Sequence, residues 1–435
     1  MQEKNTLTLP HDILHIIDVL NNNDYEAYLV GGCVRDFLME RKPADWDIAT
    51  NAKTSNIKKL FQKTIDTGLK HGTVTVVLNK ENYEITTYRK KQNLKDDLSV
   101  RDFTINAIAY HPKQGFVDPF FGIDDVKNSI IRCVGKAEER FLEDPLRMLR
   151  AIRFSSTLKF EIDENIINAI KDNYNLIKQV SFERIRDELS KILCSDNPFN
   201  MLILKDTGLL KNIMPEFYIC FETSQNHPYH LYNVAIHSLH TVLNIENKNH
   251  LRWTMLLHDI GKAVTKTTDS KGIDHFYNHG EQSLSIAKKI LTRFKFDNKT
   301  IYKICTLIKH HDRIISPTYK SVKKAINAVG EDVFLDLLKV QEADKKGQNL
   351  KYLNEGIEKL NKIKKIYFDI IKNKQCFKIS HLAVNGKDLI KVGFKEGKEI
   401  GNILKALLDM VIENPQLNEK EKLLKIVLEN FTPSF

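Results

Sequence analysis

The stretch YLVGGCVRDFLMERKPADWDIAT, from Tyr28 to Thr50, constrains the fold more than any other part of this chain. The apolar run before Gly31-Gly32 predicts a strand that ends in a sharp turn, where backbone N–H groups can approach an anion closely. Arg35 opens a short segment with helical character, and DWDIAT predicts a second strand. Alternation along a strand places Asp45 and Asp47 on one face. The stretch therefore predicts a strand–helix–strand unit with two carboxylates directed at one site.

The chemistry of these residue types suits a nucleoside triphosphate. Paired carboxylates on rigid backbone can hold one or two Mg²⁺ ions, which align an attacking hydroxyl and neutralise departing pyrophosphate. A glycine turn followed by a helix can hold the phosphates. Taken alone, however, the same residues are more typical of a plain turn and an exposed sheet edge.

The pattern of apolar residues along the sequence predicts an α+β head followed by helical domains. Short apolar runs such as GTVTVVL and YEITTY alternate with turn residues up to about position 125, and helical spacing dominates afterwards. We expect a head with a small mixed sheet, an all-α neck, a histidine-bearing helical domain and a lysine-rich helical tail. The predicted ranges are 1–125, 126–221, 222–347 and 348–435.

Composition limits the class of protein. The net charge of +10 and the isoelectric point of about 9.0 favour a polyanionic partner. The six cysteines form no CxxC pair, which indicates reduced thiols and a cytoplasmic location. Neither a leader-like N-terminus nor an apolar run of membrane-spanning length is present in the sequence, so no membrane partner is expected.

A series of motifs in fixed order carries a family resemblance. VGGCVRD, DWDIATNA, TGLKHGTV, EITTYR, RDFTINAIAY, DPFFGIDD and EDPLRMLRAIRF occur between Tyr28 and Phe154. The series resembles class II tRNA nucleotidyltransferases and bacterial poly(A) polymerases, whose head has the polymerase β-like nucleotidyltransferase fold. FERIRDELSKIL and the C-terminal NGKDLIKVGFKEGKEIGNIL extend the likeness nearly across the chain.

The resemblance implies roles for the head residues. Asp45 and Asp47 would be the catalytic residues that bind Mg²⁺, and Gly31, Gly32 and Arg35 would face the triphosphate. Glu84 is either a third carboxylate of the site or an ordinary strand residue. Within a motif usually written RRD, which approaches the ribose in the family, Arg101 and Asp102 match the last two positions, and Val100 replaces the first arginine.

The segment EDPLRMLRAIRF, expected to be one helix, carries the predicted base-selecting residues. Ionised Asp144 can only accept hydrogen bonds and Arg147 can only donate them. Cytosine and adenine complement such a pair, because each presents an amino donor beside a ring-nitrogen acceptor. The resemblance implies that Asp144 and Arg147 select CTP and ATP without a template. It also implies that Glu143, Arg150 and Arg153 brace them or the triphosphate. Alternatively, Glu143 and Arg147 form a simple surface pair at i, i+4.

The short connection between Arg89 and Arg101 points to one branch of the family. Full CCA-adding members carry a longer flexible loop here, which the switch from CTP to ATP requires, and enzymes that add only two cytidines are similar in having it shortened. We therefore expect a CC-adding enzyme that needs a separate A-adding partner. The alternatives are a full CCA-adding enzyme that uses CTP and ATP, and a poly(A) polymerase.

A second set of motifs resembles an HD domain. HLYNVAIH, LLHDIGK, FYNHGE, LIKHHD and EADKKGQ supply imidazole and carboxylate groups of the kind that bind Mn²⁺, Ni²⁺, Fe²⁺ or Mg²⁺. Lys262 could steady a phosphate. The expected ligands of a first metal are His237, His258, Asp259 and Asp344, and His279 and His310 match the positions that hold a second metal in some HD phosphohydrolases.

The expected partner of the whole chain is tRNA. Its acceptor arm would lie along the basic tail, with recognition through shape and phosphates. A second, phosphohydrolase activity on terminal phosphates is expected from the HD residues. A hydrolase with an inactive head, and a purely RNA-binding protein, remain alternatives.

Overall fold

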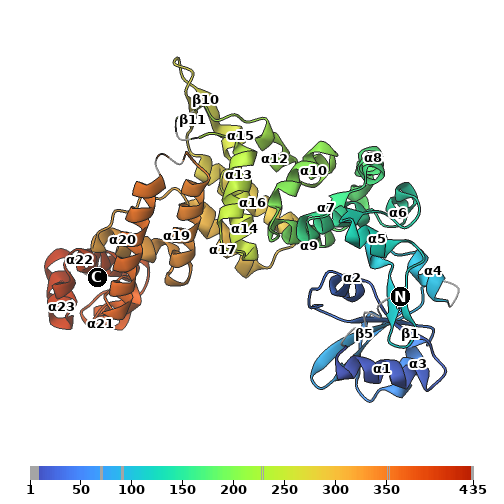
Figure 1. The fold of residues 1–435 in the computed structure, drawn as a ribbon. Coiled ribbons are helices and arrows are strands. Elements are labelled where there is room, and N and C mark those ends of the chain that lie inside the picture. Colours follow the sequence, from blue (N-terminus) through green and yellow to red (C-terminus); the bar gives the residue numbers. More distant parts are fainter. Residues whose placement is uncertain are drawn as a thin grey trace. The chain divides into compact units, whose positions relative to one another are not determined.

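The computed structural model describes residues 9–68, 72–89, 93–226, 228, 230–349, 351 and 353–432. Contacts divide the chain into two compact units, 1–213 and 214–435, and each is described by itself. Within the described residues the strands concentrate in the first unit and the second is almost entirely helical (Figure 1). The fold is α+β, as predicted.

A mixed sheet organises the first unit. Its strand order is β3-β4-β5-β2-β1-β6-β7, with β2 and β5 parallel and the other neighbours antiparallel. The strands are β1 (Ala27–Val30), β2 (Asp47–Thr50), β3 (Thr64–Gly68), β4 (Thr73–Leu78), β5 (Glu81–Thr87), β6 (Ala109–His111) and β7 (Gly115–Val117). A separate pair, β8 (Ile130–Ile131) and β9 (Glu161–Ile162), is parallel.

Helices surround this sheet and continue beyond it. They are α1 (His11–Asn21), α2 (Gly32–Leu38), α3 (Thr54–Leu60), α4 (Leu94–Ser99), α5 (Gly122–Lys127), α6 (Ala137–Glu143), α7 (Leu146–Leu158), α8 (Glu164–Asn173), α9 (Phe182–Leu193), α10 (Met201–Asp206) and α11 (Leu209–Ile213). Leu94 and Leu98, one turn apart on α4, are buried in a cluster with Val30, Ala49 and Ala109 of the sheet. The second half of the short connection between Arg89 and Arg101 is thus a helix packed into the core.

The second unit is a set of packed helices with one small hairpin. The helices are α12 (Pro215–Tyr218), α13 (Val234–Asn244), α14 (Asn249–Leu257), α15 (Lys262–Thr265), α16 (His279–Arg293), α17 (Asn298–His310), α18 (Tyr319–Val329), α19 (Glu331–Lys346), α20 (Leu353–Lys372), α21 (Gly386–Lys391), α22 (Lys398–Glu413) and α23 (Lys420–Asn430). The hairpin joins β10 (Lys266–Thr268) to β11 (Asp274–Phe276). Among the described helices, none combines the length and apolar character needed to cross a membrane.

Two expected elements differ from the prediction. The strand expected over DWDIAT begins only at Asp47, because its neighbour β1 stops at Val30, where Gly31 turns the chain with φ +76°. The helix expected over EDPLRMLRAIRF is interrupted. Asp144 is extended, with φ −149° and ψ 100°, and α7 begins after Pro145. A residue before proline disfavours the helical region, which explains the break.

Candidate functional site

Three carboxylates converge at the beginning of β2. Asp47 stands opposite Glu84 in the parallel register of β2 and β5, and Asp45 precedes it by two residues. Burial, then the charges of Asp45 and Glu84, raise the pKa of Asp47 to about 6, although Arg101 and Arg89 oppose the shift. Such a concentration of negative charge is only partly compensated by the protein, so the donors fit a hard divalent cation.

The glycine turn lies against this cluster. A β-carbon on Gly31 would come within 3.0 Å of an Arg101 guanidinium nitrogen and 3.7 Å of an Asp47 oxygen. Its positive φ also disfavours any side chain. The absence of a side chain at Gly31 therefore lets the turn lie close to Arg101 and Asp47.

Arg35 is buried in the first unit and not extended into solvent. Its guanidinium donates to Asn106 Oδ1 at 2.7 Å and to Asp36 Oδ1 at 2.6 Å, and lies over the ring of Phe154. These contacts hold the guanidinium close to the Gly31-Gly32 turn, since a β-carbon on Gly32 would lie 3.7 Å from Arg35 Nη2.

The remaining residues of the RRD-like motif belong to a buried ionic network. Arg101 Nη2 donates to Asp97 at 3.1 Å, and Asp102 accepts from Arg150 Nη2 at 2.6 Å. Burial would raise the pKa of Asp102, but Arg150 and the amide of Asn106 lower it to about 2. At Val100, where an arginine was expected, the backbone oxygen accepts from Arg147 Nη2 at 3.0 Å.

The predicted base-selecting residues lie at the break between α6 and α7. Arg147 donates to Glu143 at 2.9 Å, so the simple i, i+4 pair is present. Asp144 is not paired with Arg147. Both of its oxygens accept from Arg184, at 2.8 and 3.3 Å, while 30% of its side chain stays exposed.

Residues of α9 complete this site and were not predicted. Arg153 Nε donates to Glu188 at 2.8 Å, and Arg150 approaches the same carboxylate at 4.0 Å. The sequence could have indicated the ion pairing of Glu188, because this residue falls within the apolar stripe formed by Ile185, Leu189 and Ile192. A carboxylate on a buried face requires a charged partner.

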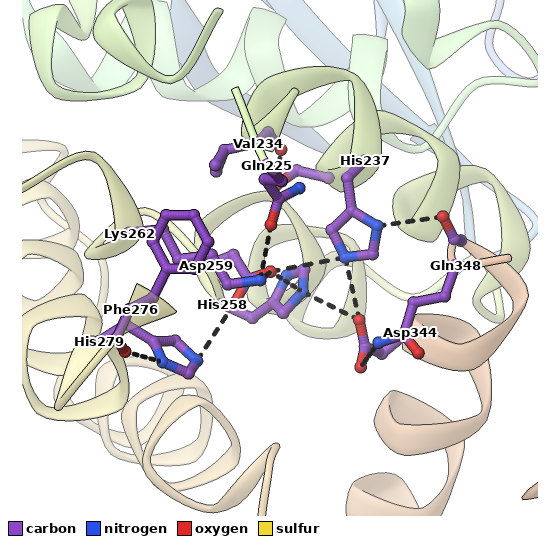
Figure 2. A network of polar contacts seen from close by, with 12 residues as sticks. Gln225, Val234, His237, His258, Asp259, Lys262, Phe276, His279, Asp344 and Gln348 are labelled. Atoms are coloured by element: carbon purple, nitrogen blue, oxygen red, sulfur yellow. Dashed lines mark hydrogen bonds and ion pairs between the residues drawn. The ribbon is translucent and has the colours of Figure 1, made fainter. Parts of the chain in front are cut away.

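The second unit gathers the predicted HD residues around one carboxylate. Asp259 Oδ2 lies 3.5 Å from His237 Nε2 and 3.3 Å from His258 Nε2, and Asp344 Oδ1 lies 3.0 Å from His237 Nε2 (Figure 2). His237, His258, Asp259 and Asp344 form one group able to hold a metal ion. The other oxygen of Asp259 belongs to a second group with His279 and His311, at 3.5 and 3.6 Å.

The second group corrects one predicted residue, because the structure places His311 there and not His310. His311 continues the buried row of Ile304, Leu307 and Ile308 on α17 at helical spacing, whereas His310 lies off that row. Applying this period to the pair in LIKHHD would have selected His311.

Hydrogen bonds to backbone carbonyls fix the tautomers of the four histidines. Nδ1 of His237, His258, His279 and His311 lies 2.7 to 3.1 Å from the oxygens of Gly347, Met255, Phe276 and Ile308. A carbonyl can only accept, so each Nδ1 carries a proton and each Nε2 is the ring nitrogen that faces the carboxylates. This pattern is typical of metal-ligating histidines.

The buried ring nitrogen of His258, at the centre of the first group, also supports metal binding. His258 Nε2 is buried and makes no well-aligned hydrogen bond among the described residues, although oxygens of Asp259 and Asp344 lie 3.3 and 3.4 Å away. With no cation present, burial would lower the pKa of His258, but Asp259 and Asp344 raise it to about 10. A divalent cation would replace that proton, so the donor set fits a metal.

Lys262 is buried beside the group. Its Nζ lies 2.7 Å from Asp259 Oδ2 and donates to Gln225 Oε1 at 2.9 Å (Figure 2). In this arrangement the lysine forms an ion pair with Asp259, and Gln225 is a neighbour that the sequence did not indicate.

Comparisons with known proteins identify the class. Residues 27–132 match the Poly A polymerase head domain. Residues 159–220 match a probable RNA and SrmB-binding site of polymerase A. Residues 267–427 match a putative domain 2 of tRNA nucleotidyltransferases. With the head geometry, these matches define an RNA nucleotidyltransferase.

Relatives that span the whole chain identify the family. The chain is 33% identical to the CCA-adding enzyme of Lactobacillus helveticus, over 94% of both proteins. It is also 33% identical to that of Ligilactobacillus salivarius, over 96% of this chain and 95% of the relative. The crystal structure of the Bacillus stearothermophilus CCA-adding enzyme in complex with CTP is similar with a TM-score of 0.74 and 29% identity, over 96% of each chain. The chain belongs to the family of CCA-adding tRNA nucleotidyltransferases.

Proposed function

We propose that the head adds cytidines from CTP to the 3′ end of tRNA, with catalysis at Asp45 and Asp47. The observation that carries this proposal is the convergence of Asp45, Asp47 and Glu84 beside the Gly31 turn. The two aspartates would hold Mg²⁺, which supplies activation of the attacking hydroxyl and charge neutralisation at the departing pyrophosphate. Glu84 would act as a third carboxylate.

The protein's own residues would bind and orient the nucleotide. The backbone at Gly31 and Gly32, with Arg35 behind the turn, faces the triphosphate, and Arg101 approaches the ribose. Asp102 takes the sugar side of the site in the rigid frame set by Arg150. The backbone oxygen of Val100 accepts from Arg147 and would help to position this base-reading residue.

Asp144 and Arg147 would read the base. Arg184 donates to both oxygens of Asp144 and so orients the carboxylate, while Glu143 orients Arg147 as a donor. Arg153 and Glu188 brace the start of this network from α7 and α9. These fixed charges would select an amino donor beside a ring-nitrogen acceptor.

We further propose that addition stops after two cytidines. The support is the connection after Arg89, in which α4 is packed into the core by Leu94 and Leu98. Residues 90–92, which complete the connection, lie outside the described residues. The rival is a full CCA-adding enzyme that uses CTP and ATP, which the names of the relatives favour. A CC-adding enzyme would act before a separate A-adding enzyme.

The second unit would be an HD phosphohydrolase that acts on terminal phosphates. His237, His258, Asp259 and Asp344 would hold one divalent metal, and Asp259 would share a second with His279 and His311. Such ions supply an activated water and polarise a phosphoryl oxygen. The lysine-rich segment from residue 348 would bind the tRNA acceptor arm, as the fourth domain after head, neck and HD domain.

Separating the two activities tests both proposals in one protein. Asp45→Ala is expected to lower incorporation of CTP into tRNA at least 1,000-fold, on the order of several kcal/mol of lost transition-state stabilisation, while Mn²⁺-dependent hydrolysis of p-nitrophenyl phosphate persists. His258→Ala is expected to have the reverse effect. Parallel loss of both activities in each variant would contradict two independent sites.

A further inference from the structure

A cavity beside the proposed HD centre provides a second anion site. It has a volume of about 230 Å³, and both His311 and Asp344 line it, so it is continuous with the two metal-binding groups. Ligand pockets for drug-sized molecules measure roughly 300–1,000 Å³. This cavity is smaller, and its size suits one sugar-phosphate unit.

Basic side chains dominate the polar wall of the cavity. Arg313, Lys345 and Lys359 line it, and among the described residues no carboxylate lies within ion-pair distance of any of the three. Two acidic residues also line the cavity: Asp312, and Asp344, which is a proposed metal ligand. Three cations against one free carboxylate leave a net positive wall, which favours an anion.

The helix that faces the cavity leaves room for the side chain of Lys345. A β-carbon on Gly356, in the first turn of α20, would come within 2.6 Å of Lys345 Cδ and 3.4 Å of its Nζ. Glycine disfavours a helix by about 1 kcal/mol relative to alanine. The absence of a side chain at Gly356 gives the aliphatic part of Lys345 the space to lie against α20, beside the proposed metal ligand Asp344.

We infer that this cavity binds a second phosphate of the substrate, one sugar away from the phosphate that is hydrolysed at the metal-binding groups. The inference rests on the proposed HD phosphohydrolase and specifies its substrate class: a ribonucleotide unit with a 3′-phosphate at the centre and a 5′-phosphate in the cavity. A water oxygen bonds to the 3′-phosphorus and the bond from phosphorus to O3′ breaks. O3′ takes a proton, and the products are inorganic phosphate and a free 3′-hydroxyl.

Release of phosphate with Mn²⁺ present, from substrates with and without the second phosphate, tests this inference. Cytidine 3′,5′-bisphosphate is expected to be hydrolysed with a kcat/KM about tenfold above that of cytidine 3′-monophosphate, since one charge-assisted contact is worth about that factor. Lys345→Ala should remove the preference through KM and leave the monophosphate unchanged. Lys364→Ala is the matched control, because Lys364 is exposed on α20 and does not line the cavity.

Gly356→Ala provides a variant that retains every charge. Its new methyl group should displace Lys345 and lower the preference severalfold, while alanine favours the helix, so unfolding would not explain the loss. Equal losses for both substrates, or no preference in the unmodified protein, would overturn the second phosphate site. An oligoribonucleotide with a 3′-phosphate, tested beside the free bisphosphate, distinguishes an RNA end from a mononucleotide as the source.

A binding measurement separates this inference from the hydrolase itself. If no substrate, including p-nitrophenyl phosphate, releases phosphate, the proposed HD activity fails. Calorimetric titration with cytidine 3′,5′-bisphosphate still decides the cavity, with Lys345→Ala expected to weaken binding about tenfold. Binding at the head is common to both proteins and cancels in the difference. Identical titrations would overturn the site.

Discussion

At the scale of single residues, the carboxylate cluster of the head lowers the stability of the fold. Asp47 lies among like charges, and its pKa of about 6 stands above the ordinary 3.8. Because its pKa is raised in the folded state, protonated Asp47 makes its full contribution to stability below pH 3.8. This contribution is lost as the pH rises through 6 and the carboxyl ionises. At neutral pH the ionised Asp47 therefore destabilises the fold, as expected for a site prepared for a cation.

Asp47→Asn tests this relation. We expect the variant to lose nucleotide transfer and to gain about 1–2 kcal/mol of unfolding free energy at pH 7 in EDTA, a value discounted because Asp47 is partly exposed. The gain should disappear near pH 4, where Asp47 is protonated in the folded state. Urea unfolding at both pH values measures it, and a variant less stable than the original protein at pH 7 would contradict the assignment.

Arg184 is the residue whose role the sequence motifs did not indicate. If it holds Asp144 as an acceptor, Arg184→Ala should raise KM for CTP about tenfold and reduce discrimination against UTP, because the freed carboxylate loses its orientation. Arg186→Ala on the same helix, where the arginine is paired with Asp187, is the control. Unchanged selectivity between CTP and UTP in Arg184→Ala would exclude the positioning role.

At the scale of elements, the break between α6 and α7 sets the base-selecting geometry. Pro145 keeps Asp144 extended and lets Arg147 begin a new helix. Helical periodicity alone predicted one continuous helix, because the pattern of apolar residues survives the break. The dipeptide Asp-Pro was the local signal that competed with it.

Pro145→Ala is the corresponding prediction. Without the ring, the helical region becomes available to Asp144, and we expect kcat/KM for CTP to fall at least tenfold while overall stability changes by no more than about 1 kcal/mol. Pro215→Ala, at the first position of α12, is a control in the other unit. Initial rates of CTP incorporation decide the outcome, and full activity would show that the break does not position Asp144.

At the scale of the whole molecule, local patterns predicted the architecture well. The motif order predicted the family, and strand alternation and helical spacing predicted the α+β class. Contacts between distant segments were harder to predict, because Arg184 with Asp144 and Asp259 with His311 depend on how helices pack. His311 shows the limit, since the motif LIKHHD offers two adjacent histidines and only the buried side of α17 distinguishes His311 from His310. The division into four domains stays a prediction.

The number of nucleotides added is the most direct test of the account. A tRNA that lacks its 3′ CCA would be extended with Mg²⁺ and with CTP, ATP or both, beside Asp45→Ala, and the products resolved at single-nucleotide length. We predict arrest after two cytidines even when ATP is present, and no extension by the variant. Addition of a terminal adenosine would contradict the CC restriction, a long adenosine tract would indicate a poly(A) polymerase, and extension by Asp45→Ala would contradict the catalytic site.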